Sequence, residues 1–208
     1  MLAPKSSIVT GGSGAIGKAI ACLLASHGSS VAICGRRLPP LEAACADISR
    51  ALPPSCTGSV RPYVCDVTQE DDAVALFSAC SDVDLLVNSA GIAAGGPTSE
   101  LSKSTFQNVL DVNVLGPFLC SREAMKHMAS RGTGGRIINV GSISAYSPRP
   151  NSAPYTTSKF ALDGLTRSLA LDGREMGIAV IQTETINRRI YYRSACSKYV
   201  TISTNLFM

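Results

Sequence analysis

The chain has 208 residues, of which 45% are hydrophobic, and a formal net charge of +4. This length suits one domain with a substantial core. Its apolar runs are shorter than the ~20 residues of a membrane span, and its scattered basic residues exclude a nucleic-acid stripe.

Short apolar runs alternate with helical patterns along the chain. The expected strands are residues 7–10, 31–34, 62–65, 85–88, 136–140 and 178–181, and the expected helices are 16–26, 41–51, 71–79, a long helical region at 104–130, and 155–172. Continuously apolar strands separated by helices are typical of a parallel sheet that is covered on both faces. We therefore predict an α/β fold of the Rossmann type, with a doubly wound parallel sheet.

A glycine-rich turn joins the first expected strand to the first expected helix, and it contains Gly12-x-Gly14-x-x-Gly17. Glycine permits a tight turn and a close approach of the backbone, and a helix N-terminus favours a pyrophosphate. The turn therefore predicts dinucleotide binding, although a turn that only reverses the chain is the alternative. The expected contacts come from Gly11, Ser13, Gly14, Ile16 and Gly17.

The second expected strand ends in Arg36 and Arg37, where an NAD-binding fold usually carries an acid for the ribose hydroxyls. A guanidinium pairs with a 2′-phosphate, whereas a carboxylate repels it. This favours NADP(H) over NAD(H), the alternative being two solvated arginines. After the third strand, Asp66 is a candidate partner for the adenine amino group or, equally, a turn residue.

Two further groups of residues stand at strand ends or on a helix. Asn88, Ala90 and Gly91 follow the fourth expected strand, where small residues let the backbone lie against a cofactor. Tyr155 and Lys159 are four residues apart, so they share one face of a helix. A lysine ammonium there favours the phenolate and lowers the pKa of the phenol, which suits proton transfer to a carbonyl or alcohol oxygen. Two half-exposed helix residues are the alternative.

These features together resemble the short-chain dehydrogenase/reductase family, most closely its 3-oxoacyl-carrier-protein reductase branch. The matching motifs are Thr-Gly-x-x-x-(Gly/Ala)-x-Gly at 10–17, Asp66-Val67, Asn-x-Ala-Gly at 88–91, Asn113, Ser142, and Tyr-x-x-x-Lys at 155–159. The resemblance covers about residues 5–181. It implies a dinucleotide site that includes Val67, Tyr155 and Lys159 along with the positions named above.

The resemblance also implies four catalytic roles. Tyr155 is the general acid in reduction, Lys159 lowers its pKa and holds the nicotinamide ribose, and Ser142 polarises the substrate carbonyl. Asn113 holds a water that links the lysine to solvent. Ser142 is favoured over Ser144 because it precedes Tyr155 by the spacing of the family, although a serine at a strand end is more often a cap.

The end of the chain departs from the family pattern. Family members carry a Pro-Gly turn, a substrate lid of two helices, a long helix and a seventh strand after the sixth strand, but no proline follows Pro154 here. We therefore expect a domain over 1–181 that contains the catalytic residues, and a divergent tail over 182–208 with no clear fold signal. The sheet should lack its last strand and lid, leaving an exposed edge at 179–181.

Two functions follow from these expectations. The first is an NADPH-dependent reduction of a ketone or 3-oxoacyl thioester to the alcohol, and the alternative is a truncated, catalytically silent dinucleotide-binding protein. We expect a small-molecule carbonyl or acyl-thioester substrate, no nucleic-acid partner, and a homodimer through the helices at 104–130 and 155–172.

The eight cysteines include no Cys-x-x-Cys pair, and the only histidines are His27 and His127. Buried reduced thiols and no metal site are therefore expected. The first apolar run begins by Ser7, leaving no room for a signal or transit peptide. We expect a cytoplasmic protein.

Overall fold

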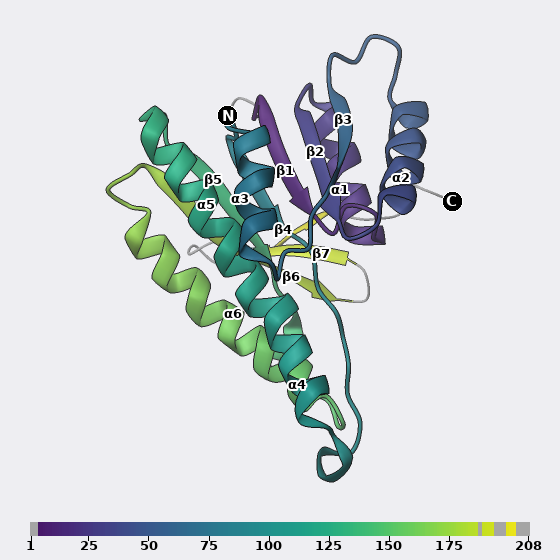
Figure 1. The fold of residues 1–208 in the computed structure, drawn as a ribbon, viewed down its shortest axis with the longest axis vertical. Helices are drawn as coiled ribbons and strands as arrows, with labels where there is room; N and C mark the ends of the chain where they lie inside the picture. The colour runs from purple at the N-terminus through teal and green to yellow at the C-terminus, as the bar shows by residue number, and fades with distance from the viewer. Residues whose placement is uncertain (1–3, 187–188, 194–198, 203–208) are drawn as a thin grey trace.

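The computed structural model describes residues 4–186, 189–193 and 199–202, and from residue 185 onward it describes the backbone alone. A single twisted sheet has helices on both of its faces (Figure 1). The strands are β1 (Ser6–Thr10), β2 (Ser30–Gly35), β3 (Ser59–Val64), β4 (Leu85–Asn88), β5 (Gly135–Val140), β6 (Ile178–Ile186), β7 (Arg189–Arg193) and β8 (Tyr199–Ile202). The helices are α1 (Ala15–Ser26), α2 (Leu38–Ala51), α3 (Glu70–Ala79), α4 (Lys103–Leu110), α5 (Gly116–Arg131) and α6 (Ala153–Asp172).

The sheet has the strand order β3-β2-β1-β4-β5-β6-β7-β8, and its first six strands are parallel. The order reverses between β1 and β4, which opens a crevice at the carboxyl ends of these strands. The predicted doubly wound fold is confirmed.

The core forms two layers, one on each face of the sheet. On one face α1 and α2 pack over the strands around Val31 and Ile33, with Leu41 fully buried between them. On the other face α5 and α3, the latter through Phe77, pack over Ile8. Alternate residues of each strand enter opposite layers, so the continuous apolar runs of the sequence are needed to fill both.

Helix α2 and strand β3 each begin three residues before the expected position, and a proline is involved in both cases. Helix α2 begins at Leu38 because Pro39 and Pro40 occupy its first turn, where the missing N–H groups would have no helical partner. Strand β3 covers 59–64 and includes Pro62, which an edge strand tolerates because one side of its backbone forms no ladder.

The long helical region at 104–130 is divided by one wide turn. A π-helical segment at Asp111–Leu115 joins α4 to α5, and Asn113 lies inside it. Such wide turns occur mostly as single turns within α-helices and are frequent at functional sites.

The sheet continues beyond the expected boundary at residue 181. Strand β6 runs on to Ile186, β7 pairs with Thr183–Ile186 in antiparallel orientation, and β8 pairs with β7. The threonines and the isoleucine of this segment favour extended backbone. Polar and apolar residues do not alternate clearly here, so the sequence alone does not predict a strand. Within the described residues no helix follows α6. Strand β7 pairs with β6 only from Thr183 onward. Exposure of the sheet edge at residues 179–181, which precede this pairing, stays a prediction.

A row of three amide side chains, two buried and one half-buried, crosses strands β4, β5 and β6. Asn139 on β5 lies opposite Asn88 on β4 and opposite Gln182 on β6. Its Oδ1 accepts from Asn88 Nδ2 at 2.8 Å, and its Nδ2 donates to the Thr166 hydroxyl at 2.9 Å. The row ties three strands and α6 together at the end of the sheet where ligands bind in this fold.

Replacing Asn139 with alanine should therefore destabilise the fold. The change leaves buried groups of Asn88 and Thr166 without this partner, at a cost of about 2–3 kcal/mol in the free energy of unfolding. Urea titration measures the loss. Gln107→Ala is the matched control, because it removes an exposed amide bond to Asp111 and should cost less than about 0.5 kcal/mol. Equal losses in the free energy of unfolding for the two variants would contradict the role of Asn139 in holding the strands together.

Candidate active site

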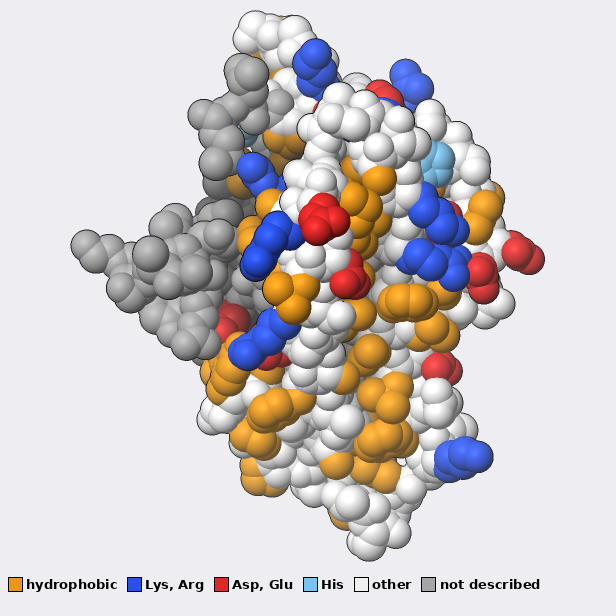
Figure 2. Space-filling model, turned by 90° about the vertical axis from the view of Figure 1, so that its left-hand side faces the viewer, with side chains coloured by type: hydrophobic (Ala, Val, Ile, Leu, Met, Phe, Trp, Pro, Cys, Tyr) orange, Lys and Arg blue, Asp and Glu red, His pale blue; other side chains and the backbone are white. Residues whose placement is uncertain are grey.

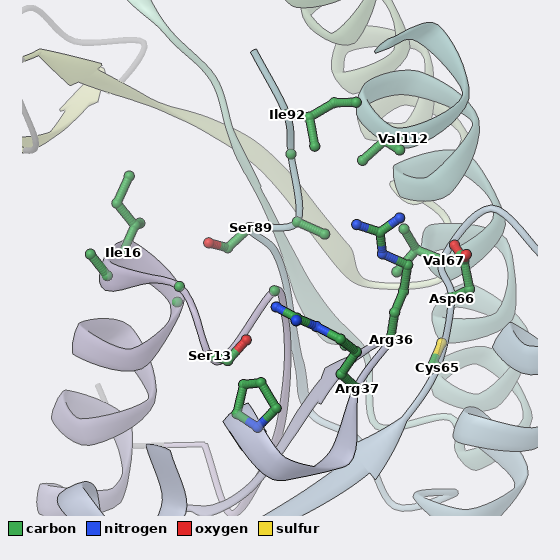
Figure 3. A pocket seen from close by; sticks show the side chains of 18 residues that line it. Ser13, Ile16, Arg36, Arg37, Cys65, Asp66, Val67, Ser89, Ile92 and Val112 are labelled. Atoms are coloured by element: carbon green, nitrogen blue, oxygen red, sulfur yellow. The ribbon is translucent and has the colours of Figure 1, made fainter. Parts of the chain in front are cut away.

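A pocket of about 440 Å³ opens at the carboxyl ends of β1, β2 and β4 (Figure 3). Its wall combines the turn before α1, the end of β2, the segment after β3 and the segment after β4. The lining residues are Gly11, Ser13, Gly14, Ala15, Ile16, Gly17, Gly35, Arg36, Arg37, Pro40, Cys65, Asp66, Val67, Ser89, Ala90, Gly91, Ile92 and Val112.

The glycine turn forms the floor of this pocket, and its shape requires glycine at positions 11 and 17, among others. Gly11 has φ +65, which side chains rarely adopt, and a Cβ on Gly17 would collide with the Gly11 carbonyl oxygen. The turn is fixed to the end of β4 by Thr10, whose Oγ1 accepts from the backbone N–H groups of Ser89 and Ala90 at 3.0 Å each. A dinucleotide pyrophosphate fits this cradle at the N-terminus of α1.

Arg36 and Arg37 lie at the rim, and both side chains are exposed. In Figure 3 the Arg37 side chain extends toward Ser13, whereas that of Arg36 lies near Asp66 and Val67. Asp66 is the one carboxylate among the residues that line the pocket in the described chain. Its Oδ1 accepts from the N–H of Thr68 at 3.1 Å and from its hydroxyl at 2.9 Å, so it also serves as a turn residue.

Asn88 is the one expected cofactor residue outside both the pocket lining and the catalytic helix. Its side chain is buried, and its Nδ2 donates to Asn139 and to the Ser121 hydroxyl at 3.0 Å. Asn88 therefore does not line the pocket, and its hydrogen bonds hold the strand end that carries the pocket wall. Several lining residues were not predicted, namely Gly35, Pro40, Cys65, Ser89, Ile92 and Val112. Five of these adjoin predicted positions, Val112 because it precedes Asn113, whereas Pro40 carries no signal in the sequence.

The expected catalytic residues gather on α6 and on the segment that follows β5. Lys159 is 6% exposed, and its Nζ donates to the Val140 carbonyl at 2.8 Å. The same Nζ lies 5.7 Å from the centroid of the Tyr155 ring. Ser142 follows β5 by two residues and is buried, and its Oγ accepts from the N–H of Ser144 at 3.2 Å. The lysine thus links the helix that carries the tyrosine to the strand that presents the serine.

Asn113 fastens the pocket to the same helix. Its Oδ1 accepts from Ile92 N–H and its Nδ2 donates to the Ile92 carbonyl, both at 2.9 Å. Its Nδ2 also donates to the Ser158 hydroxyl at 2.9 Å, and that hydroxyl donates to the Tyr155 carbonyl at 2.7 Å. The wide turn lets one side chain reach both elements, and a water-holding role stays a prediction.

Burial lowers the pKa of Lys159 from 10.5 to about 8. The charged form is disfavoured because the ammonium leaves water, and one carbonyl replaces part of its hydration. The folded protein therefore binds fewer protons at this site than the unfolded chain between about pH 8 and 10.5. Stability contributed by this group must rise with pH across that window, and the cost of burial is fully present below it.

Comparison of the Lys159→Met variant with the unaltered chain should reveal this dependence. Raising the pH from 7 to 10 should stabilise the unaltered chain relative to the variant by up to about 3 kcal/mol, since each pKa unit is worth about 1.4 kcal/mol. Urea titrations of both proteins at several pH values measure the difference. A difference that stays constant over this range would show that the lysine is not desolvated.

Comparisons with known proteins agree with this geometry. The family model for short chain dehydrogenase matches residues 5–186. Over 176 residues the chain is 36% identical to human (Homo sapiens) dehydrogenase/reductase SDR family member 11, covering 81% of this chain and 66% of the relative. It is 35% identical over 179 residues to 3-oxoacyl-[acyl-carrier-protein] reductase FabG of Rickettsia prowazekii, covering 86% and 70%. The chain thus spans about two thirds of the length of these relatives.

Solved structures show the same likeness. A short-chain type dehydrogenase/reductase from Mycobacterium marinum superimposes with a TM-score of 0.81 at 30% identity, covering 87% of this chain and 74% of that one. NAD⁺-bound xylitol dehydrogenase superimposes with a TM-score of 0.78 at 32% identity, covering 86% and 70%. The glycine-rich motif lines the pocket and the Ser142, Tyr155 and Lys159 motifs follow in the family order, and the chain belongs to the short-chain dehydrogenase family of NAD(P)-dependent oxidoreductases.

Proposed function

We propose that the protein uses NADPH to reduce a ketone or a 3-oxoacyl thioester to the alcohol. The observation that carries the proposal is the placement of Lys159, buried against the end of β5 and beside the ring of Tyr155. The lysine ammonium lies over the ring of Tyr155, and Ser142 stands on the adjoining segment. This arrangement suits a reaction that develops negative charge on a carbonyl oxygen.

In the proposed mechanism the chain polarises the carbonyl and supplies a proton. The nicotinamide cofactor supplies the hydride to the carbonyl carbon when it is bound. The Ser142 hydroxyl donates a hydrogen bond to the carbonyl oxygen, and the Tyr155 hydroxyl transfers its proton to that oxygen as charge develops there. Lys159 stabilises the phenolate that remains. The likeness to 3-oxoacyl-[acyl-carrier-protein] reductase FabG supports the thioester as a substrate class.

The preference for NADPH over NADH rests on the rim of the pocket. Arg36 and Arg37 stand where a 2′-phosphate would lie beyond the ribose, and neither has an acidic neighbour on the strand end. Guanidinium groups pair with phosphate through two parallel hydrogen bonds. The solved xylitol dehydrogenase contains NAD⁺, so the likeness to that structure does not favour NADPH, and the proposed preference rests on the two arginines alone.

A catalytically silent dinucleotide-binding protein is the second candidate. One observation favours it: among the described residues no helix follows α6, so no lid is formed there. A cofactor without a lid would be bound but not held in the geometry that hydride transfer needs.

The two candidates differ in turnover. Tyr155→Phe removes the transferable proton, so kcat for reduction of an acetoacetyl thioester should fall by about 10²–10⁴-fold. The dissociation constant of NADPH should change far less than kcat, because the tyrosine lies outside the lining of the pocket at the glycine turn. Tyr146→Phe is the matched control, since it removes a hydroxyl from an exposed tyrosine. Binding of NADPH by the unaltered chain with no turnover would establish the silent form.

Replacing both rim arginines should change the cofactor preference. In the Arg36→Ala/Arg37→Ala variant the affinity for NADPH should fall at least about tenfold, as expected for the loss of charge-assisted pairs, while the affinity for NADH stays nearly constant. Fluorescence titration measures both affinities. Arg61→Ala on β3 removes an exposed arginine outside this pocket and controls for net charge. A parallel loss of both affinities would overturn the assignment to the 2′-phosphate.

A homodimer is proposed through α4, α5 and α6. Hydrophobic side chains gather on this face of the molecule (Figure 2), and Leu115, Phe118 and Phe160 are 40%, 39% and 51% exposed. Burial of such side chains between two copies would stabilise a dimer. Phe118→Glu should therefore yield monomers in light scattering, whereas Val64→Glu on β3, also at an exposed position, should leave the mass unchanged.

The place of action is proposed to be the cytoplasm. The cysteines in the described part of the chain are free thiols, which suits a reducing compartment. None of the described helices has the length and apolar character that crossing a membrane requires.

A further inference from the structure

We infer that Gln182 is a positioning residue for the reaction, holding the segment that carries Ser142 at a fixed distance from α6. The inference rests on the proposed function. Gln182 lies on β6, one residue past the expected end of the catalytic domain, and Gly141 immediately precedes Ser142. A Cβ atom added to Gly141 would lie 2.7 Å from Nε2 and 2.8 Å from Cδ of Gln182. The amide therefore occupies the space beside the Gly141 backbone that the Cβ atom of any other residue at position 141 would fill.

The opposite edge of the same amide faces the catalytic helix. Gln182 Oε1 lies 3.3 Å from the hydroxyl of Thr166 on α6. That hydroxyl donates to the Leu162 carbonyl at 2.7 Å and accepts from Asn139 at 2.9 Å. The stronger bonds of Thr166 are thus already formed, and the contact with Gln182 is mainly one of packing. Thr166 follows Lys159 by about two helical turns. The side chain of Gln182 therefore lies between Gly141 and the helix that carries the lysine.

The backbone around Ser142 is held on its other sides by two further contacts. Gly141 N–H donates to the Thr183 carbonyl at 2.7 Å, and the Val140 carbonyl accepts from Lys159 Nζ. Residues 140–142 are therefore fixed by β6, by the lysine and by the glutamine amide together. Loss or displacement of the amide would let this segment move relative to Tyr155 and Lys159 without disturbing the dinucleotide pocket, which none of these residues lines.

A double-mutant cycle on Gly141 and Gln182 tests the inference. Gly141→Ala should lower kcat at least about tenfold, because a displacement of about 1 Å at a reacting group has an effect of this size or larger. The dissociation constant of NADPH should stay within about twofold of the original. Adding Gln182→Ala to Gly141→Ala removes the collision and should restore kcat at least about fivefold. Gln182→Met keeps the bulk without the amide and should retain more activity than Gln182→Ala.

The unaltered chain, the two single alanine variants and the double variant are also compared by urea unfolding. This measurement separates the inference about Gln182 from the proposed function. A defect in Gly141→Ala that persists unchanged in the double variant would overturn the role of Gln182. A loss of NADPH affinity equal to the loss of kcat would also overturn it, because the change would then be a general disturbance. If the unaltered chain binds NADPH but reduces no carbonyl compound, the proposed function fails. The free energies of unfolding of these four proteins then test the contact between Gly141 and Gln182. Additive effects of the two substitutions on this free energy would contradict the contact.

Discussion

Lys159 extends from α6 to the carbonyl of Val140 at the end of β5 and is buried there, 6% exposed. An ammonium in such a place is costly, and the cost appears as a pKa lowered to about 8. The fold tolerates this because the same contact sets the catalytic helix against the strand that presents Ser142. Asn113 and the amide row around Asn139 secure the same junction from the neighbouring elements.

The cofactor half of the site depends on a different constraint, which is closeness of backbone. Gly11 and Gly17 meet at a distance that excludes side chains, and Thr10 ties the turn to the end of β4. These contacts shape the turn at the start of α1, where no side chain caps the helix and the first N–H groups have no helical partner. The two halves meet at Asn113, whose side chain bonds both the wall of the pocket at Ile92 and the hydroxyl of Ser158 on α6. A substitution of Asn113 should therefore affect both the binding of the cofactor and the reaction of the substrate.

The sequence predicts the parallel sheet and the positions of the named motifs, because both depend on local patterns. Apolar runs mark strands that are buried on two faces, and glycine spacing marks the turn. The rest depends on tertiary contacts. Nothing in the sequence indicates that Asn88 faces Asn139 behind the pocket, or that β6 continues to Ile186 and pairs with β7. The role inferred for Gln182 follows only from its position against Gly141.

The central claim is that a chain shorter than its relatives retains a working carbonyl reductase site. The most direct test follows the fluorescence of NADPH during titration with the purified protein and then after addition of an acetoacetyl thioester to the same cuvette. The account predicts saturable enhancement of the fluorescence, followed by its loss as bound NADPH is oxidised. Stable fluorescence after the thioester is added, across several ketones as well, would contradict the claim and leave a protein that binds the dinucleotide without using it.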